Sequence, residues 1–261
     1  MRVLTGNPWV FDTYQILVSG GLDSTALLLW SLENLPPERL VFVHAVTGVG
    51  WPETETYLDY LQHKTGVRIH RVRNGDLPYP PKRDGTLRDV LTTGADMLSI
   101  VQLRGKWPNP KYRYCTTYLK TWPLRLNAEQ YPNCCQVSGI RADESARRAA
   151  RPEFDPRGNK TGQPHWYPLI DWTRQDCAGM LARHGVHLNP VYRWAPRCGC
   201  WCCFMRGNTH AAGHFCRRYP DLAWPLVRLE INLGHTWRDD LSLWAVWTRA
   251  QDQMELGLCP A

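Results

Sequence analysis

The sequence lacks every feature that would place it in a membrane or outside the cell. No uninterrupted apolar run approaches the roughly 18 residues of a membrane-spanning helix. The first residues, MRVLTGNPWVFD, lack the charged-then-apolar pattern of a secretory signal. No internal repeat or low-complexity tract is present, and the 43% hydrophobic and 21% charged residues are typical of a globular chain. We therefore predict a cytoplasmic globular protein with no membrane partner.

The length and the net charge restrict the possible domain organisation and binding partners further. The 261 residues suffice for one large α/β domain, or for a main domain with a small appendage. The net charge of +7 favours polyanionic partners such as nucleotides, and it leaves nucleic acid open. The sequence leaves the oligomeric state open as well.

Apolar segments alternate between strand and helix patterns in the first third of the chain. Buried strands are predicted at 14–18, 39–46 and 67–72, and helices at 24–33 and 52–66. This alternation predicts a parallel sheet with right-handed crossovers. Later segments read as a long loop at 73–88, a helix near 89–103, a strand entering a basic loop at 134–149, and a helix capped by Thr173.

Two adjacent glycines interrupt the first strand–helix pair, in the segment SGGLDST at residues 19–25. Glycines there let backbone N–H groups converge on an anion, and the following helix directs its positive end at the same point. Hydroxyls of Ser19, Ser24 and Thr25 can donate to phosphate oxygens, and Asp23 can orient the loop or hold magnesium. The segment lacks the lysine of a Walker A loop and the three-glycine spacing of a dinucleotide fingerprint. A tight turn with a good helix cap is the competing interpretation.

This segment resembles the PP-loop of the adenine nucleotide α-hydrolase superfamily, which includes ATP pyrophosphatases and sulfonucleotide reductases. Further segments resemble the phosphoadenosine phosphosulfate (PAPS) reductase family within it: TGVGWPET (47–54), PNPKYRYCTTYLKTWPL (108–124), VSGIRADESARR (137–148), YPLIDWTRQDC (167–177) and LNPVY (188–192). One departure is Val46, which stands where the family has an acidic residue before Thr-Gly.

The resemblance implies a Rossmann-like (HUP-type) α/β fold with a parallel sheet flanked by helices, followed by a small cysteine-rich helical element. The domains expected from it are a nucleotide-binding domain at 1–193 and a metal-binding, helical C-terminal region at 194–261. It also implies an adenine nucleotide, ATP rather than PAPS, bound with Mg²⁺. The nucleotide-binding residues would be Ser19, Gly20, Gly21, Asp23, Ser24, Thr25, Gly48 and Arg113.

The same resemblance brings two basic segments to the phosphate side of the site. Lys120, Arg141 and Arg148 would stabilise negative charge on the leaving pyrophosphate or sulfate. Arg141 is the strongest candidate, since Gly139 precedes it and Glu144 can fix it. Solvated surface arginines are the alternative for any single one of these residues.

Five of the ten cysteines lie between Cys198 and Cys216. Cys200 and Cys203 have the two-residue gap of a metal knuckle. The segment GCWCC resembles that of the DNA phosphorothioation sulfurtransferase branch of the family, where a cysteine equivalent to Cys115 joins the later pair. This likeness implies a [4Fe–4S] cluster on Cys115, Cys200 and Cys203. The sequence does not determine the fourth ligand; Cys216 is preferred to Cys198 or Cys202 because it lies farther along the chain and can reach back. A zinc site formed with His210 and His214, or free thiols, are the alternatives.

Three functions follow from these features. The first is a PP-loop enzyme that adenylates or sulfurates an acceptor with release of pyrophosphate; a sulfur donor protein and a nucleic acid acceptor are conceivable partners. The second is a sulfonucleotide reductase producing sulfite, which typically uses a cysteine in a Glu-Cys-Gly-hydrophobic-His motif. The sequence ends MELGLCPA, with Cys259 but without that motif. The third is a non-catalytic nucleic-acid-binding protein with a zinc knuckle.

Overall fold

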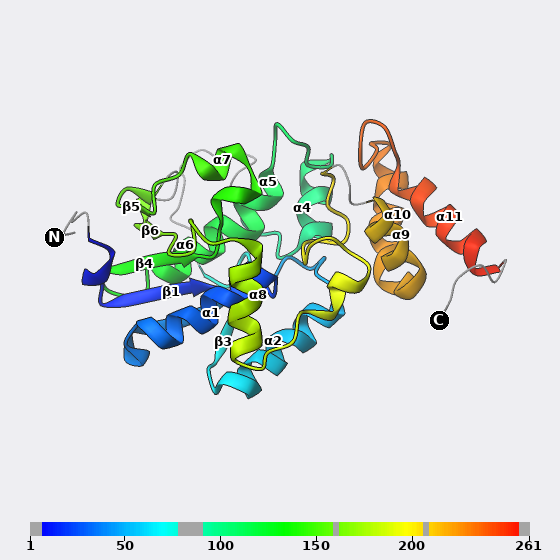
Figure 1. Ribbon diagram of the computed structural model, residues 1–261. Helices are drawn as coiled ribbons and strands as arrows, with labels where there is room; N and C mark the ends of the chain where they lie inside the picture. The colour runs from blue at the N-terminus through cyan, green and yellow to red at the C-terminus, as the bar shows by residue number, and fades with distance from the viewer. Residues whose placement is uncertain (1–6, 78–90, 159–161, 206–208, 256–261) are drawn as a thin grey trace, which may run out of the picture. The chain divides into compact units, whose positions relative to one another are not determined.

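The computed structural model describes residues 7–77, 91–158, 162–205 and 209–255 (Figure 1). The chain divides into two compact units. The first, here called the sheet unit, comprises Met1–Ala45, Pro52–Val72 and Thr121–Pro190. The second, the cysteine unit, comprises Val46–Trp51, Arg73–Lys120 and Val191–Ala261.

The sheet unit is built on six strands in the order β3-β2-β1-β4-β6-β5. All neighbouring strands are parallel except β5, which runs antiparallel to β6. The strands are β1 (Thr13–Leu17), β2 (Leu40–Ala45), β3 (Ile69–Val72), β4 (Cys134–Ser138), β5 (Phe154–Asp155) and β6 (His165–Trp166). The predicted α/β class with a mostly parallel sheet is confirmed.

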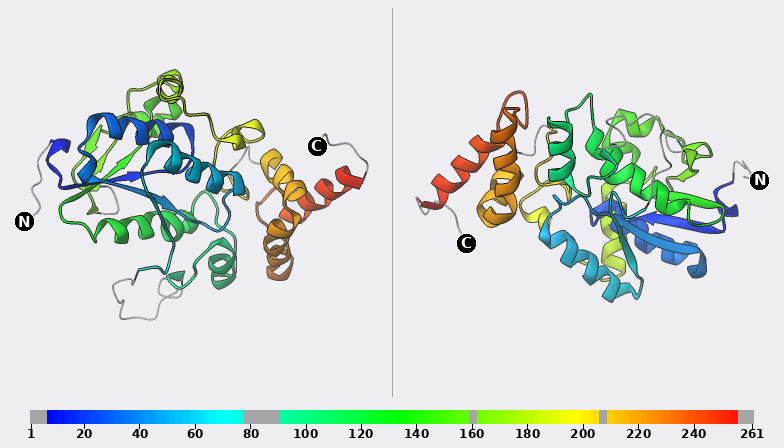
Figure 2. Two further views of the ribbon diagram at one scale, coloured as in Figure 1. Left: turned by 90° about the horizontal axis from the view of Figure 1, so that it is seen from below. Right: turned by 180° about the vertical axis from the view of Figure 1, so that it is seen from behind.

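Helices cover both faces of this sheet. Figures 1 and 2 show α1 (Leu22–Asn34), α2 (Pro52–Thr65) and α8 (Arg174–Arg183) on one face and α6 (Trp122–Ala128) on the other. Strand β1 lies between β2 and β4, so the sheet is extended first on one side of β1 and then on the other. The carboxyl ends of such strands form the crevice where open α/β sheets bind ligands. The segment after β1 is therefore at the expected ligand position.

The cysteine unit is helical and has its own hydrophobic core. Its helices are α4 (Met97–Arg104), α5 (Tyr114–Thr116), α9 (Thr209–Arg218), α10 (Pro220–Leu233) and α11 (Leu243–Glu255). Trp51, Trp107, Trp201 and Trp237 are each almost fully buried in this core. The buried Glu230 carboxylate accepts the backbone N–H groups of Trp237, Leu243 and Trp244, and so fixes the start of α11.

Shorter helices complete the two units. They are η1 (Pro8–Val10), η2 (Pro37–Arg39), η3 (Thr117–Thr121, a π-helix), η4 (Ala142–Glu144), α7 (Ala146–Ala149) and η6 (Pro190–Arg193). Helix α5 continues through η3 into α6, so a π-helical stretch interrupts one longer helix. Such stretches occur often at functional sites.

Most predicted elements agree with the structure to within a few residues. Thr173 caps α8 as predicted, since its hydroxyl accepts the N–H of Asp176 at 3.2 Å. The short pair β5 and β6 was not predicted. Most of the predicted loop at 73–88, and Cys259, lie outside the described residues, and within the described part α4 begins only at Met97.

The predicted domain boundary after residue 193 stays a prediction; the chain enters the cysteine unit for the last time at Val191. Among the described helices, none combines the length and the apolarity that crossing a bilayer would require.

Candidate functional site: the turn after β1 and the cysteine cluster

The turn between β1 and α1 requires glycine at residue 20. Gly20 has a φ of +76°, a conformation that side chains disfavour. A Cβ atom there would lie 2.9 Å from Thr54 Cγ2 and 3.2 Å from Asn189 Nδ2. Both the backbone conformation and the lack of space therefore explain the residue. Gly21 is extended instead and forms the N-cap of α1.

The three hydroxyls of the turn have different roles. Ser24 Oγ accepts the Ser19 N–H at 3.1 Å and donates to the Gly21 carbonyl at 3.1 Å, so it closes the turn. Thr25 Oγ1 is buried and has no hydrogen-bond partner among the described residues. Ser19 is exposed, and its hydroxyl lies 3.0 Å from Ser24 Oγ. Of the three, Ser19 is thus the hydroxyl open to a ligand.

Helix α1 begins without a side-chain cap. The N-cap residue, Gly21, has no side chain that could accept a hydrogen bond from the first turn of the helix. Uncapped N–H groups at the positive end of a helix form a binding site for phosphate. The residues present thus fit the phosphate tail of a nucleotide.

Asp23 lies in the first turn of α1 and would repel an anion if its charge were free. Its carboxylate instead accepts a hydrogen bond from Arg141 Nε at 2.8 Å. Arg141 is only 6% exposed and also donates to Asp143 at 2.5 Å. Burial by itself would lower the pKa of Arg141, but the bond to Asp23 and the charges of Asp23 and Asp143 raise it. The pairing favours an orienting role for Asp23 over a free metal-binding carboxylate.

The segment after β4 packs directly against this turn. A Cβ atom on Gly139 would lie 2.5 Å from the Asp23 carbonyl oxygen, so only glycine permits the contact. The backbone N–H of Arg141 donates to Glu144 at 3.1 Å, and Glu144 in turn forms an ion pair with Arg148. The structure therefore places Arg141 beside the turn after β1 and links Arg148 to it through Glu144.

Asn189 is a structural partner of the turn that sequence reasoning did not single out. Its amide donates to the Gly20 carbonyl at 3.0 Å and to Thr54 Oγ1 at 3.4 Å, and the residue is 1% exposed. The signal was available, because the segment LNPVY belongs to the family resemblance. Its role as a clamp on Gly20 is visible only in three dimensions.

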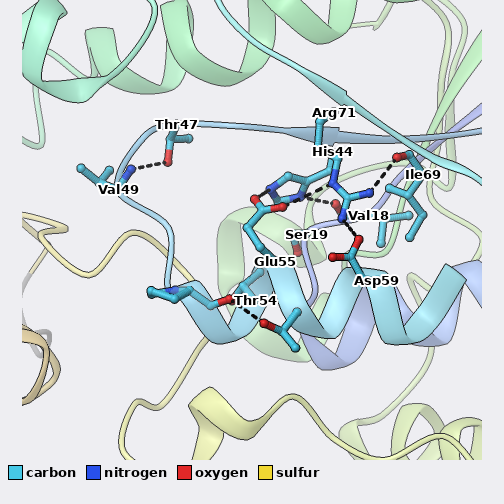
Figure 3. A network of polar contacts seen from close by, with 12 residues as sticks. Val18, Ser19, His44, Thr47, Val49, Thr54, Glu55, Asp59, Ile69 and Arg71 are labelled. Carbon is cyan, nitrogen blue, oxygen red and sulfur yellow. Dashed lines mark hydrogen bonds and ion pairs between the residues drawn. The ribbon is translucent and has the colours of Figure 1, made fainter. Parts of the chain in front are cut away.

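A second network supports the end of β1 (Figure 3). His44 Nδ1 lies 2.8 Å from the Val18 carbonyl, one residue before the turn, and its Nε2 lies 3.7 Å from Glu55. Arg71 pairs with Glu55 at 3.3 Å and with Asp59 at 2.5 Å. The network joins β2, α2 and β3 to the strand that carries the turn. No sequence motif predicted this network.

Three of the residues predicted to bind the nucleotide or act in catalysis belong to the cysteine unit. Gly48 has a φ of +75°, and a Cβ atom there would overlap the side chain of Asp96. Arg113 is exposed at the start of α5, and its guanidinium lies 3.4 Å from Thr116 Oγ1. Lys120 is exposed in the π-helical stretch. All three keep the status of predictions.

The predicted metal ligands Cys115, Cys200 and Cys203 share one neighbourhood of the cysteine unit. Cys200 and Cys203 lie on one turn, with the Cys203 N–H donating to the Cys200 carbonyl at 3.1 Å. Burial, followed by the charge of Cys200, raises the pKa of Cys115 to about 11; Cys203 acts in the same direction, and Lys120 opposes it. The Sγ atom of Cys200 lies 3.5 Å from Thr47 Oγ1.

The remaining cysteines differ in their surroundings. The pKa of Cys202 is raised, first by burial and then by the charges of Cys200, Cys203 and Cys115. Burial raises the pKa of Cys216 to about 12, and the charge of Arg217 opposes this shift. Among the described residues, no three or more His, Cys, Asp or Glu side chains form a group that could hold a metal ion. The thiols thus fit a metal centre in residue type and neighbourhood, but not as a closed shell.

The zinc alternative involves two histidines of α9. His214 stacks on Trp194, with ring centroids 4.9 Å apart. His210 lies one helical turn earlier and lines a cavity between α9 and α11.

Comparisons with known proteins identify the family. A sequence model of the phosphoadenosine phosphosulfate reductase domain matches residues 13–81 and 95–205. The chain belongs to this family. It is 30% identical to an uncharacterized 37.8 kDa protein of Escherichia phage 186, over 80% of this chain and 72% of that one. It is 25% identical to a phosphoadenosine 5'-phosphosulfate reductase of Cronobacter sakazakii, over 66% of this chain and 72% of the relative.

A solved structure confirms the fold of the PAPS reductase family. The PAPS reductase from Candida auris, in its phosphate complex, superposes with a TM-score of 0.51 at 13% identity, covering 74% of this chain and 83% of that one. The predicted Rossmann-like fold and the predicted membership of a family of PP-loop enzymes are therefore confirmed. The family match includes the turn after β1 and extends through Cys203, but it ends at residue 205, before Cys216.

Proposed function

We propose that the chain is a PP-loop enzyme that binds ATP at the turn after β1 and adenylates or sulfurates an acceptor with release of pyrophosphate. The observation that carries this proposal is the geometry of that turn. Gly20 requires its positive φ, α1 begins uncapped, and the acidic residue of the first turn is neutralised by a buried arginine. A polyphosphate is the ligand class that such a turn suits best.

Each group of the proposed nucleotide site has a proposed role. Backbone N–H groups of Gly20, Gly21 and the first turn of α1 hold the phosphates, with Ser19 as a further donor. Arg141 fixes Asp23 and adds positive charge at the site. By the family resemblance, Lys120 and Arg148 are assigned to stabilising the charge that develops on the leaving pyrophosphate, and Arg113 and Gly48 to binding the nucleotide. Mg²⁺ accompanies the nucleotide, held mainly by its phosphates.

We further propose a [4Fe–4S] cluster on Cys115, Cys200 and Cys203, with Cys216 as the fourth ligand predicted from the sequence. Such a cluster, when bound, supplies sulfur-handling or redox chemistry. Support comes from the shared neighbourhood of the three thiols and from the turn that joins two of them. Because these side chains do not form a closed shell in the structure, no step of the reaction is assigned to the cluster.

Anaerobic purification with an absorption spectrum and metal analysis tests the cluster. We expect a brown protein with about four irons per chain. Cys200→Ser should lose the iron, whereas Cys134→Ser, in buried strand β4, should keep it. Cys216→Ser and Cys202→Ser then decide the fourth ligand. A colourless protein with one zinc would instead give Cys200 and Cys203 a structural role.

Pyrophosphate release tests the main proposal. ATP is incubated with the protein and candidate acceptors, including modified DNA, modified tRNA and small molecules, with and without a sulfur donor protein. Acceptor-dependent pyrophosphate supports the proposal. The alternative, reduction of PAPS, is favoured by the names of the curated relatives. It predicts thioredoxin-dependent sulfite instead, and that result with no pyrophosphate from ATP would replace the proposal.

A further inference from the structure

A cavity in the cysteine unit lies outside both the phosphate turn and the cysteine cluster. It has a volume of about 260 Å³ and lies between α9 and α11. Figure 2 shows α9, α10 and α11 packed side by side. These helices follow residue 205, where the match to the family ends. Family membership therefore says nothing about this cavity.

The polar side chains that line the cavity are basic or neutral. Arg217 comes from α9, and Arg249 and Gln253 come from α11. Arg217 donates to Gln253 Oε1 at 2.7 Å, which holds its guanidinium at the wall of the cavity. Arg249 is exposed and forms no hydrogen bond or ion pair with another described residue. One guanidinium is thus fixed in place, and a second is available to a ligand.

A third arginine lies at the edge of the cavity. Arg238 donates to Thr209 Oγ1, a lining atom, at 2.8 Å. Its charge is shared with Asp240, to which it also donates at 2.6 Å. His210 adds a ring nitrogen to the lining. The concentration of cationic groups is therefore local to this cavity.

The acidic side chains that the structure describes in residues 209–255 do not line the cavity. Residues 209–255 contain six carboxylates against five arginines, so the segment as a whole is not basic. None of the five carboxylates whose side chains the structure describes lines the cavity. Glu230 is buried under the start of α11, and Asp240 is paired with Arg238. The charge is thus segregated, with cations facing the cavity.

We propose that this cavity binds a backbone phosphate of a nucleic acid chain. One guanidinium can donate two parallel hydrogen bonds to the oxygens of a phosphate. Arginine is one of the residue types that contact the phosphates of nucleic acid backbones. The volume is below the range of about 300–1,000 Å³ for pockets that enclose a small-molecule ligand. It suits one phosphate of a longer chain rather than a whole free nucleotide. The net charge of +7 would attract such a polyanion.

This inference goes beyond the proposed nucleotide chemistry and does not depend on it. The test uses the full-length protein and a fluorescein-labelled oligonucleotide, single-stranded or duplex, followed by fluorescence anisotropy over a series of salt concentrations. Arg249→Gln and Arg217→Gln should each weaken binding about tenfold and reduce the slope of log K against log salt by about 1. Arg249→Lys keeps the charge and should retain most of the slope.

Arg228→Gln is the matched control, because Arg228 is an exposed arginine of α10 that does not line the cavity. It should leave the binding and the slope unchanged, and melting temperatures should show that all variants remain folded. Equal effects of Arg228→Gln and Arg249→Gln would overturn the proposal, as would an absence of oligonucleotide binding. Binding of inorganic phosphate alone, lost in Arg249→Gln while oligonucleotides do not bind, would overturn the assignment to nucleic acid.

Discussion

The two units of the molecule prepare their sites in different ways. In the sheet unit, the polar groups around the turn already bond to one another: Arg141 to Asp23, Asn189 to Gly20, and Ser24 to Ser19. In the cysteine unit, the thiols share a neighbourhood but form no closed group among the described residues, and burial raises the pKa of Cys115. A phosphate site can be preorganised by hydrogen bonds, whereas thiols become good ligands only after they lose their protons. The comparison predicts that substitutions in the turn act on ligand binding directly.

The largest effect on ATP affinity is expected from Gly20→Ala. The side chain would impose a disfavoured φ and crowd Thr54, so nucleotide affinity should fall about 100-fold or more. Isothermal titration calorimetry with ATP measures this change. Gly66→Ala is the matched control, since Gly66 has a φ of +73° but open space around its Cβ position. It should cost about 1–2 kcal/mol of stability and leave ATP affinity unchanged. Equal losses of affinity in both variants would show that the turn has no special role.

Glu230→Ala should have the largest effect on stability, as distinct from ligand binding, and this effect originates in the cysteine unit. The buried carboxylate accepts three backbone N–H groups, and its removal leaves them unsatisfied. We expect a loss of about 4 kcal/mol in the free energy of unfolding of this unit. Denaturant unfolding followed by tryptophan fluorescence measures it, with Asp252→Ala, at an exposed residue of α11 in the same unit, as the control. A loss of stability no larger than that of the control would contradict this structural role of Glu230.

His165 gives the sheet unit a dependence on pH. Burial, and then the charge of Arg151, lower the pKa of this histidine to about 4. In the unfolded chain its pKa is about 6.5, so the unfolded state binds more protons between these values. Stability should therefore rise as the pH increases from about 4 to 6.5, by up to about 3 kcal/mol from this residue.

The difference between the wild type and His165→Gln isolates that contribution. Chemical denaturation at a series of pH values should show a steeper loss of stability in the wild type below about pH 6.5. Both proteins should have parallel curves above that pH. Parallel curves throughout the acidic range would contradict a His165 that stays neutral in the folded protein.

Arg141→Lys is expected to have the smallest of these effects. Lysine keeps the charge but cannot bond Asp23 and Asp143 at once with a planar fork. ATP affinity should fall about tenfold, and Arg147→Lys, on an exposed neighbouring arginine, should leave it unchanged. An unchanged affinity in Arg141→Lys would reduce the role of Arg141 to that of a point charge.

The sequence predicted the parts of the fold that depend on local patterns. The glycine pair, the alternating strands and helices, and the cap at Thr173 all follow from short-range chemistry, and the structure agrees. The nearness of Arg141 to the turn came from the family resemblance. Its bond to Asp23 spans 118 residues, so no local pattern could have predicted it.

The parts that were missed depend on distant partners. Asn189, just before η6, and Thr54 of α2 meet at Gly20 although they are far from it in sequence. The role of His44 becomes visible only from the contact of its ring with the Val18 carbonyl. Local patterns could not show that residues 46–51 and 73–120 belong to the same compact unit as the C-terminal region, because long gaps in sequence separate these segments.

The central claim is that backbone N–H groups around Gly20 and Gly21 hold the phosphates of a nucleotide. Amide resonances of deuterated, ¹⁵N-labelled protein can be followed while ATP or, separately, adenosine is added. The account predicts that the amides of residues 19–24 shift with ATP and remain in place with adenosine. ATP that binds without moving those amides, or adenosine that moves them equally, would contradict it.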